Sequence, residues 1–181
     1  MKRSYVLKEN LTGRDIPEFE TKLDVTLTDT DLIFEFYCKN SKYFSASDKY
    51  NGPLFDGDVC EAFICMDGSR KHYYEIEIAP NGAVFFMKMT NKLNPEEPND
   101  LIENPIEDCF MTSKVELLDG GDYTVMFSLP LDKIGYDKEK GILFNAYRIE
   151  TEGGIPEKNL LALNPTLRPR FHCPQFFVEL K

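Results

Sequence analysis

Apolar and polar residues alternate with a period of two along most of this chain, and this pattern constrains the fold more than any other feature. Leu23, Val25 and Leu27 alternate with polar residues, and the alternation resumes over residues 32–38 after a Thr-Asp-Thr-Asp turn. Successive side chains of a strand point to opposite faces, so each segment predicts a strand with one buried face. Together the two segments predict an opening β-hairpin.

Further strands are predicted at residues 59–66, 73–78, 83–89, 113–118, 123–129, 142–149 and 175–180. A Pro-Asn-Gly turn and an Asp-Gly-Gly-Asp turn separate two pairs of them. Only residues 131–136 indicate a helical turn, whereas an α/β fold needs longer crossover helices. About nine short strands therefore predict an all-β, antiparallel β-sandwich of jelly-roll or immunoglobulin-like type. We expect one domain over residues 1–181.

Two long polar segments, residues 40–57 and 91–108, are predicted to be loops. Loops of this length inside a compact domain are usually functional or mobile. The first leads into the segment that holds the candidate site. The second carries three prolines and many acidic residues, and it is the predicted site of disorder. One alternative function is a protein-interaction or scaffold domain that presents this second loop to a partner.

Charge and cysteine content limit the partners and the compartment. The 31 acidic and 21 basic residues give a formal charge of −10, which disfavours nucleic-acid and membrane-surface partners. The first residues, MKRSYVLKEN, have no apolar run behind their basic pair. The five cysteines are odd in number and form no CxxC pair. We therefore predict a reduced, cytoplasmic chain, and the sequence leaves its oligomeric state open.

Phe55, Asp56, Asp58 and Glu61 crowd into seven positions where a buried strand begins. Asp56 and Asp58 flank a glycine and offer hard oxygen ligands, so they are the predicted metal ligands for a Ca²⁺ ion. Glu61 shares its strand face with apolar residues, where a carboxylate is costly unless it is paired. Arg148 is its candidate counter-ion.

Carbohydrate binding suits these residues better than catalysis does. Sugars present apolar C–H faces and a rim of hydroxyls, so a sugar site needs flat aromatic rings together with carboxylate, amide or guanidinium groups. The residues with this chemistry are Phe55, Glu61, Tyr73, Glu75, Asn145 and Arg148.

Catalytic alternatives rest on fewer residues. His72 and His172 lie in none of the spacings that hold a catalytic metal. Glu75 and Glu77 fall on one strand face at a separation compatible with the acids of a glycoside hydrolase. An exposed sheet face produces such a pair more often, so we expect no enzyme and no catalytic residue.

Three segments carry a resemblance to a known family. They are GDVCEAFICMDGSRKHYYEIEIAPNGAVFF (57–86), FNAYRIE (144–150) and LLALNPTLRPRFHCPQFFVEL (160–180). In this order they resemble the family 9 carbohydrate-binding modules over roughly residues 15–181. The resemblance implies a β-sandwich related to the DOMON group that binds a mono- or oligosaccharide between aromatic side chains, with structural calcium.

The resemblance also implies roles for particular residues. Phe55 stands where a stacking tryptophan is expected, and Glu61 stands at the hydrogen-bonding acid of the next strand. Asn164 falls near the second stacking aromatic, although asparagine cannot stack, and the chain has no tryptophan. The DOMON relationship adds one more alternative, haem binding through Met87 or Met89 and His172.

Overall fold

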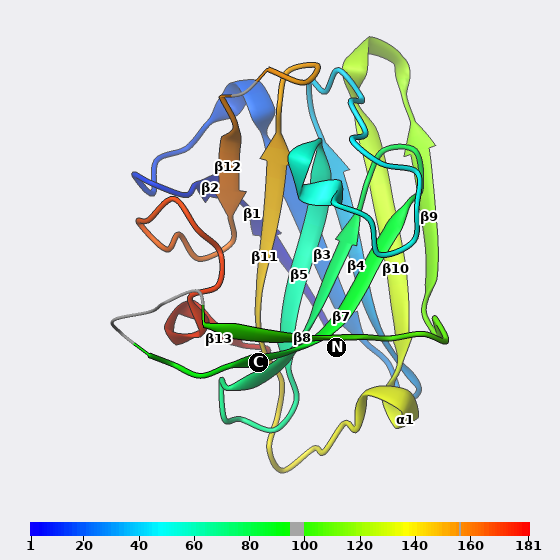
Figure 1. The fold of residues 1–181 in the computed structure, drawn as a ribbon, viewed down its shortest axis with the longest axis vertical. Helices are drawn as coiled ribbons and strands as arrows, with labels where there is room; N and C mark the ends of the chain where they lie inside the picture. Colours follow the sequence, from blue (N-terminus) through cyan, green and yellow to red (C-terminus); the bar gives the residue numbers. More distant parts are fainter. Residues whose placement is uncertain (95–99, 156) are drawn as a thin grey trace.

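Two antiparallel β-sheets pack face to face in the computed structural model, which describes residues 1–94, 100–155 and 157–181 (Figure 1). The described residues form thirteen strands and only short helical segments. The predicted all-β sandwich is therefore confirmed. None of the described helices has the length and apolar character needed to cross a membrane.

The first sheet has five strands in the order β1-β3-β4-β10-β9. Its members are β1 (Lys2–Val6), β3 (Thr21–Leu27), β4 (Asp31–Cys38), β10 (Tyr123–Pro130) and β9 (Thr112–Leu117). β3 and β4 form the hairpin that the opening alternation predicts, with Val25 opposite Phe34.

The second sheet has eight strands in the order β2-β12-β11-β5-β6-β7-β8, and β13 also pairs with β11. Its members are β2 (Lys8–Glu9), β12 (Asn159–Ala162), β11 (Leu143–Glu150), β5 (Val59–Cys65), β6 (His72–Ile78), β7 (Val84–Asn91), β8 (Leu101–Pro105) and β13 (Val178–Glu179). β5 lies at its centre between β11 and β6.

In the part of the chain that the structure describes, helical structure is confined to single turns between strands. These are η1 (Pro17–Phe19), η2 (Leu54–Asp56), η3 (Asp119–Gly121), α1 (Leu131–Ile134) and η4 (Pro174–Phe176). The helical turn predicted at residues 131–136 corresponds to α1. It ends at Gly135, whose φ of 70° suits a residue without a side chain.

The main core fills the space between the two sheets. It is rich in phenylalanine, and Phe34 and Phe127 stack at 4.9 Å while Phe144 meets Phe34 edge-on at 5.6 Å. These rings come from β4, β10 and β11, so the two sheets both contribute to one packed layer. The alternating apolar residues of each strand provide the side chains of this layer.

A second core covers the other face of the eight-stranded sheet, which we call the outer face. Phe63 and Tyr147 of the sheet pack there with Phe171 and Phe177 of the C-terminal segment. β5 is consequently buried along its whole length. The sequence predicts solvent exposure for one face of β6, and this is wrong because loops cover that face.

Four strands escaped the sequence analysis: β1, β2, β8 and β12. β8 lies within the predicted loop 91–108, of which residues 95–99 fall outside the described structure. The strand predicted over residues 175–180 is mostly the η4 turn followed by the two-residue β13. These short or irregular segments lack a long period-two pattern.

The two ends of the chain lie close together (Figure 1). The guanidinium group of Arg3, on β1, donates a hydrogen bond to the carbonyl oxygen of Lys181. The N-terminal ammonium of Met1 donates to the Leu27 carbonyl at 2.6 Å, which fixes the first residue against β3.

Candidate functional site

Three glutamates lie side by side on the outer face of the eight-stranded sheet. Glu61 on β5 stands directly opposite Glu77 on β6, and Glu75 lies two positions away from Glu77 on the same face. One carboxylate oxygen from each lies within 4.8 Å of the others. All three are buried, with exposed fractions of 2% for Glu61, 5% for Glu75 and 2% for Glu77.

Such a cluster is electrostatically costly. Two ionised carboxylates 4.8 Å apart repel by about 3.5 kcal/mol at an effective dielectric constant of about 20. Burial, and then the charge of the neighbouring glutamates, raises the pKa of Glu61 and Glu75 well above the usual range. Burial raises the pKa of Glu77 to about 8, although Lys158 and the Phe55 N–H oppose the shift. The cluster therefore holds protons or needs a compensating cation.

An aromatic layer lies beside the glutamates. His172 stacks on Phe63 with ring centroids 4.9 Å apart, and its Nδ1 shares a 2.8 Å hydrogen bond with the Tyr73 hydroxyl. Its Nε2 lies 3.7 Å from Glu75 Oε1. Burial lowers the pKa of His172 to about 4, so the ring is neutral near pH 7 and does not offset the carboxylates.

Phe55 is the exposed member of the region. It belongs to the single turn η2, and 46% of the residue is accessible to solvent. The Lys158 ammonium lies 5.9 Å from the centre of its ring and donates to the Phe55 carbonyl at 2.7 Å. The same ammonium lies 3.6 Å from the Asp56 carboxylate. An open aromatic ring is thus flanked by a cation and an anion at the surface.

A pocket of about 520 Å³ is lined in part by His172. Its volume falls in the range of small-molecule sites. Its polar lining comes mainly from Ser69, Arg70, Asn91, Arg168, Arg170, His172 and Gln175. Nε of Arg170 is buried and has no hydrogen-bond partner among the described residues, so a donor is available there.

Arg148 does not belong to the site, and its predicted role there is wrong. Glu61 pairs in register with Tyr147, so the neighbouring Arg148 points to the opposite, inter-sheet face. There its guanidinium lies 2.6 Å from Glu150 and donates to Thr21 and to the carbonyls of Phe19 and Lys39. Its guanidinium is bonded inside the core, where it cannot reach a ligand.

Asn145 and Asn164 form a structural bridge. The Asn145 side chain donates to the Asn164 carbonyl at 2.8 Å and accepts from the Asn164 N–H at 3.0 Å. The Asn164 side chain donates to the Phe176 carbonyl at 2.9 Å. These bonds fasten the C-terminal segment to β11, and they occupy the groups that a sugar would need.

Tyr73 and Glu75 lie on the outer face, as the sequence pattern predicts, but neither is open to solvent. Tyr73 is buried under Phe177, which it meets edge-on at 5.3 Å. Of the six predicted sugar-binding residues, Phe55 alone is exposed, while Glu61, Tyr73 and Glu75 lie beneath the covering loops.

Asp56 and Asp58 do not come together as a pair of ligands. Asp58 is fully buried, and its two oxygens accept hydrogen bonds from Ser41, Phe44 and Thr151. Asp56 is exposed beside Lys158. With both Asp58 oxygens occupied by protein donors, the residues present do not fit the predicted calcium site.

Three residues of this region, Lys158, Glu77 and Arg170, were not among the predicted binding residues. Glu77 could have been found, because it shares its strand face with Glu75 and stands opposite Glu61 in a β5–β6 hairpin. Lys158 and Arg170 belong to irregular segments, where no periodicity gives the direction of a side chain.

The structure has the fold of the family 9 carbohydrate-binding modules. A family 9 module of Caldicellulosiruptor kristjanssonii, solved with cellotriose, aligns with a TM-score of 0.63 and 13% identity over 99% of this chain and 81% of that one. The same module solved with glucose aligns equally well, with a TM-score of 0.63 and 13% identity over 98% and 83%. The resemblance inferred from sequence is confirmed for the fold.

A Bacteroides uniformis protein that is proposed to bind carbohydrate aligns with a TM-score of 0.73 and 16% identity, over 97% of this chain and 84% of that one. No protein-family model matches the sequence. These structural neighbours are described as carbohydrate-binding.

A curated relative corrects the predicted compartment. An extracellular protein of Arthroderma benhamiae is 29% identical over 173 residues, which cover 89% of this chain and 78% of that protein. The cytoplasmic prediction is therefore wrong, because this relative points to a secreted protein. The lack of an apolar run after the first residues did not predict the compartment correctly.

Proposed function

We propose that this chain is a non-catalytic carbohydrate-binding domain whose ligand stacks on Phe55. The observation that carries the proposal is an exposed aromatic ring flanked by the Lys158 ammonium and the Asp56 carboxylate. The ring offers a flat apolar surface to the C–H face of a sugar, and the two charged groups offer a donor and an acceptor to its hydroxyls.

The ligand class follows from the same groups and from the neighbours of the fold. The solved family 9 module is described in complex with cellotriose and with glucose, which are flat, equatorially substituted sugars. Phe55 holds the position where the resemblance expects a stacking tryptophan. A glucose unit or a short β-glucan is accordingly the ligand that we propose.

Titration with cellotriose and glucose tests the proposal, with backbone amide shifts and calorimetric heats as readouts. Phe55→Ala should lose roughly tenfold or more in affinity, because an aromatic contact contributes about 0.5–1.5 kcal/mol beyond the area that it buries. Phe55→Trp should bind more tightly than the wild type, because it enlarges the stacking surface.

Leu117→Ala is the matched control, since Leu117 is a similarly exposed apolar side chain on β9 of the other sheet. It should bind as the wild type does. Amide shifts that cluster around Arg170 and persist in Phe55→Ala would indicate that the sugar binds in the 520 Å³ pocket. This result would contradict the assignment to Phe55. If neither sugar gives saturable amide shifts or heats, the proposed function is contradicted.

A further inference from the structure

The glutamate cluster has the spacing of an oxygen-coordinated cation site. One oxygen each of Glu61, Glu75 and Glu77 lies within 4.8 Å of the other two. Ca²⁺ binds oxygen at 2.3–2.6 Å, so two ligands on opposite sides of it lie at most about 4.6–5.2 Å apart. Three oxygens within 4.8 Å of one another can therefore surround one cation of this kind.

A second observation points to a missing partner. Oε1 of Glu61 and Oε2 of Glu77 are buried, and neither has a hydrogen-bond donor among the described residues. Buried polar atoms in folded proteins are almost always satisfied, so each unsatisfied one needs an explanation. These two atoms belong to residues that stand opposite each other on β5 and β6.

The surroundings supply little positive charge. Among the ion pairs of the described residues, the cluster takes part in one contact, from His172 Nε2 to Glu75 Oε1 at 3.7 Å. The His172 Nδ1 is already engaged by Tyr73. Lys158 acts on the cluster from a greater distance, because its ammonium is held by the Phe55 carbonyl and lies near Asp56.

The rest of the outer face gives the site rigid walls. Tyr147 and Phe85 flank the Glu61–Glu77 pair in register, and Phe63 and Met87 flank Glu75. All four side chains are buried. Three carboxylates in an apolar enclosure form a hard-oxygen ligand set, which selects Ca²⁺ or Mn²⁺ over softer metals.

We propose that Glu61, Glu75 and Glu77 bind one divalent cation, Ca²⁺ by preference, in the outer face of the eight-stranded sheet. The site is separate from the Asp56 and Asp58 pair that the sequence suggests. It does not depend on the proposed sugar binding, because the cation lies below the loops and Phe55 lies at the surface.

The experiment uses the full chain after treatment with a chelator, followed by calorimetric titration with CaCl₂ and, separately, by Tb³⁺ luminescence excited through tyrosine. We expect one cation per chain and a higher thermal midpoint in excess Ca²⁺. Glu61→Gln and Glu75→Gln should each weaken binding at least about tenfold, because carboxylate number sets the affinity of such sites.

Glu35→Gln is the matched control, as it removes an exposed carboxylate from β4 on the other sheet. It should leave cation binding unchanged. Phe55→Ala should also leave it unchanged, which separates this inference from the proposed function. Both glutamine variants keep the side-chain shape and remove a buried charge, so a far-ultraviolet circular dichroism spectrum should show them folded.

Two results would overturn the proposal. One is the absence of heat, luminescence and midpoint shift in the wild type, which would mean that protons alone neutralise the cluster. The other is a cation whose binding is lost in Asp56→Asn and kept in Glu61→Gln.

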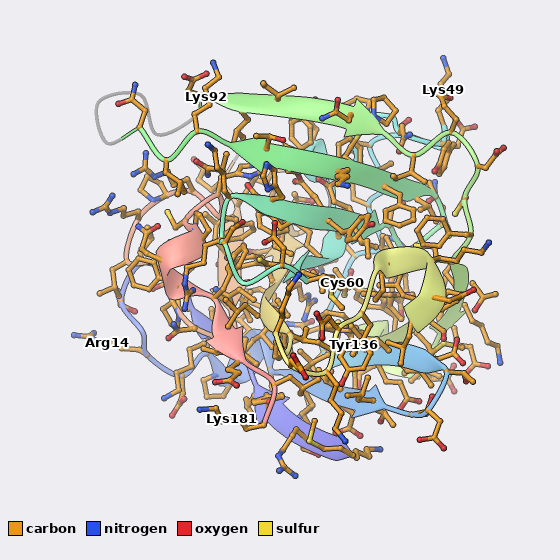
Figure 2. All side chains as sticks on the ribbon, turned by 90° about the horizontal axis from the view of Figure 1, so that it is seen from below. Arg14, Lys49, Cys60, Lys92, Tyr136 and Lys181 are labelled. Atoms are coloured by element: carbon orange, nitrogen blue, oxygen red, sulfur yellow. The ribbon has the colours of Figure 1, made fainter. Side chains whose placement is uncertain are left out.

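An independent observation concerns two cysteines in the main core. Cys38 on β4 and Cys60 on β5 belong to different sheets, and their Sγ atoms lie 3.4 Å apart. Both are fully buried. Figure 2 shows Cys60 inside the molecule, whereas the labelled Arg14, Lys49, Lys92 and Lys181 project outward.

The local chemistry favours reaction between these thiols. Burial raises the pKa of Cys38, but the hydrogen bond from Cys60 and the charge of Arg148 more than offset it, so the pKa falls below the ordinary value. A disulfide has an S–S length of about 2.05 Å, so the sulfur atoms must approach by roughly 1.3 Å. The extracellular relative places a similar chain where disulfides persist.

We infer that Cys38 and Cys60 form a disulfide that joins the two sheets when the chain folds in an oxidising compartment. The two thiols lose two protons, and two electrons pass to oxidised glutathione or to the disulfide of a thiol oxidoreductase, which becomes a dithiol. The new bond joins two cysteines that are 22 positions apart in the sequence.

Refolding of the full chain with oxidised and reduced glutathione, followed by thiol counting under denaturing conditions, tests this inference. Three of the five thiols should remain, and peptide mapping should link Cys38 to Cys60. Oxidation should raise the thermal midpoint of the wild type and of Cys65→Ala, but not that of Cys60→Ala. Five remaining thiols, or a bond through the exposed Cys109, would refute it.

Discussion

Replacement of Arg148 by methionine should destabilise the protein strongly without affecting sugar affinity. The guanidinium is fully buried and bonded to Glu150, Thr21 and two backbone carbonyls. Methionine fills much of the same volume but leaves the buried Glu150 carboxylate without its counter-ion. Removal of one partner from a buried ion pair costs about 3–5 kcal/mol.

The expected shift of the thermal midpoint follows from the size of the chain. For domains of 150–250 residues, 1 kcal/mol lowers the thermal midpoint by about 2–4 °C, so a loss near 4 kcal/mol corresponds to about 8–16 °C. Urea unfolding and calorimetry at pH 7 measure both quantities. Cellotriose affinity of the folded variant should stay within about twofold of the wild type.

The loss of stability in Arg148→Met should also depend on pH. Burial raises the pKa of Glu150, and Arg148 opposes that rise, so the pKa climbs further in Arg148→Met. A carboxyl group whose pKa is raised in the folded state destabilises that state as the pH rises above its unfolded value of 4.5. The stability difference from the wild type should therefore be smaller at pH 5 than at pH 8.

Glu150→Gln combined with Arg148→Met completes a double-mutant cycle. Because the double variant has no unpaired carboxylate, it should recover part of the stability that Arg148→Met loses. A stability loss below about 1 kcal/mol in Arg148→Met, together with loss of cellotriose binding, would refute the reasoning. It would indicate that Arg148 contacts the ligand.

Three further changes give separate tests. Gly57→Ala should lower stability by about 1–3 kcal/mol in urea, because the new Cβ would lie 2.7 Å from the Ala46 nitrogen and 2.8 Å from the Phe44 oxygen; an unchanged midpoint would contradict this backbone packing. Asn164→Ala should cost about 1–3 kcal/mol and leave cellotriose affinity intact; weaker binding would contradict its structural role. Burial raises the pKa of Asp67, but hydrogen bonds outweigh it and bring the value to about 2, so the stability advantage over Asp67→Asn should hold above pH 4 and vanish as the pH falls towards 2. An advantage that persists at pH 2 would contradict that assignment.

The positions of the main strands along the chain could be predicted from the sequence because their burial alternates. Val25 and Phe34 illustrate this, since each lies on an alternating face and the two meet across the β3–β4 hairpin. The prediction that Arg148 is the counter-ion of Glu61 did not follow this alternation, since Arg148 stands opposite Cys60 and points to the other face. Glu150 lies two positions from Arg148 on the same strand face, so alternation was enough to suggest that pair. Thr21 could not be predicted, because it reaches Arg148 only through the packing of the two sheets.

The accessibility of the site could not be predicted from the same pattern. Glu75 and Glu77 alternate with apolar residues, as they would on a strand with one solvated face. Glu75 is covered by a C-terminal segment that returns about a hundred positions later and is held by the Asn145–Asn164 bridge, whereas Glu77 lies beside the η2 turn. A period-two pattern distinguishes one face from the other, but it does not show whether irregular chain covers the polar face.

The bond from Arg3 to Lys181 has a consequence for protein architecture. A unit whose two ends meet can be spliced into a surface turn of a host protein, because the host chain enters and leaves at nearly the same point. A circular permutant that connects these ends through a few glycines should for the same reason keep the native arrangement of both sheets.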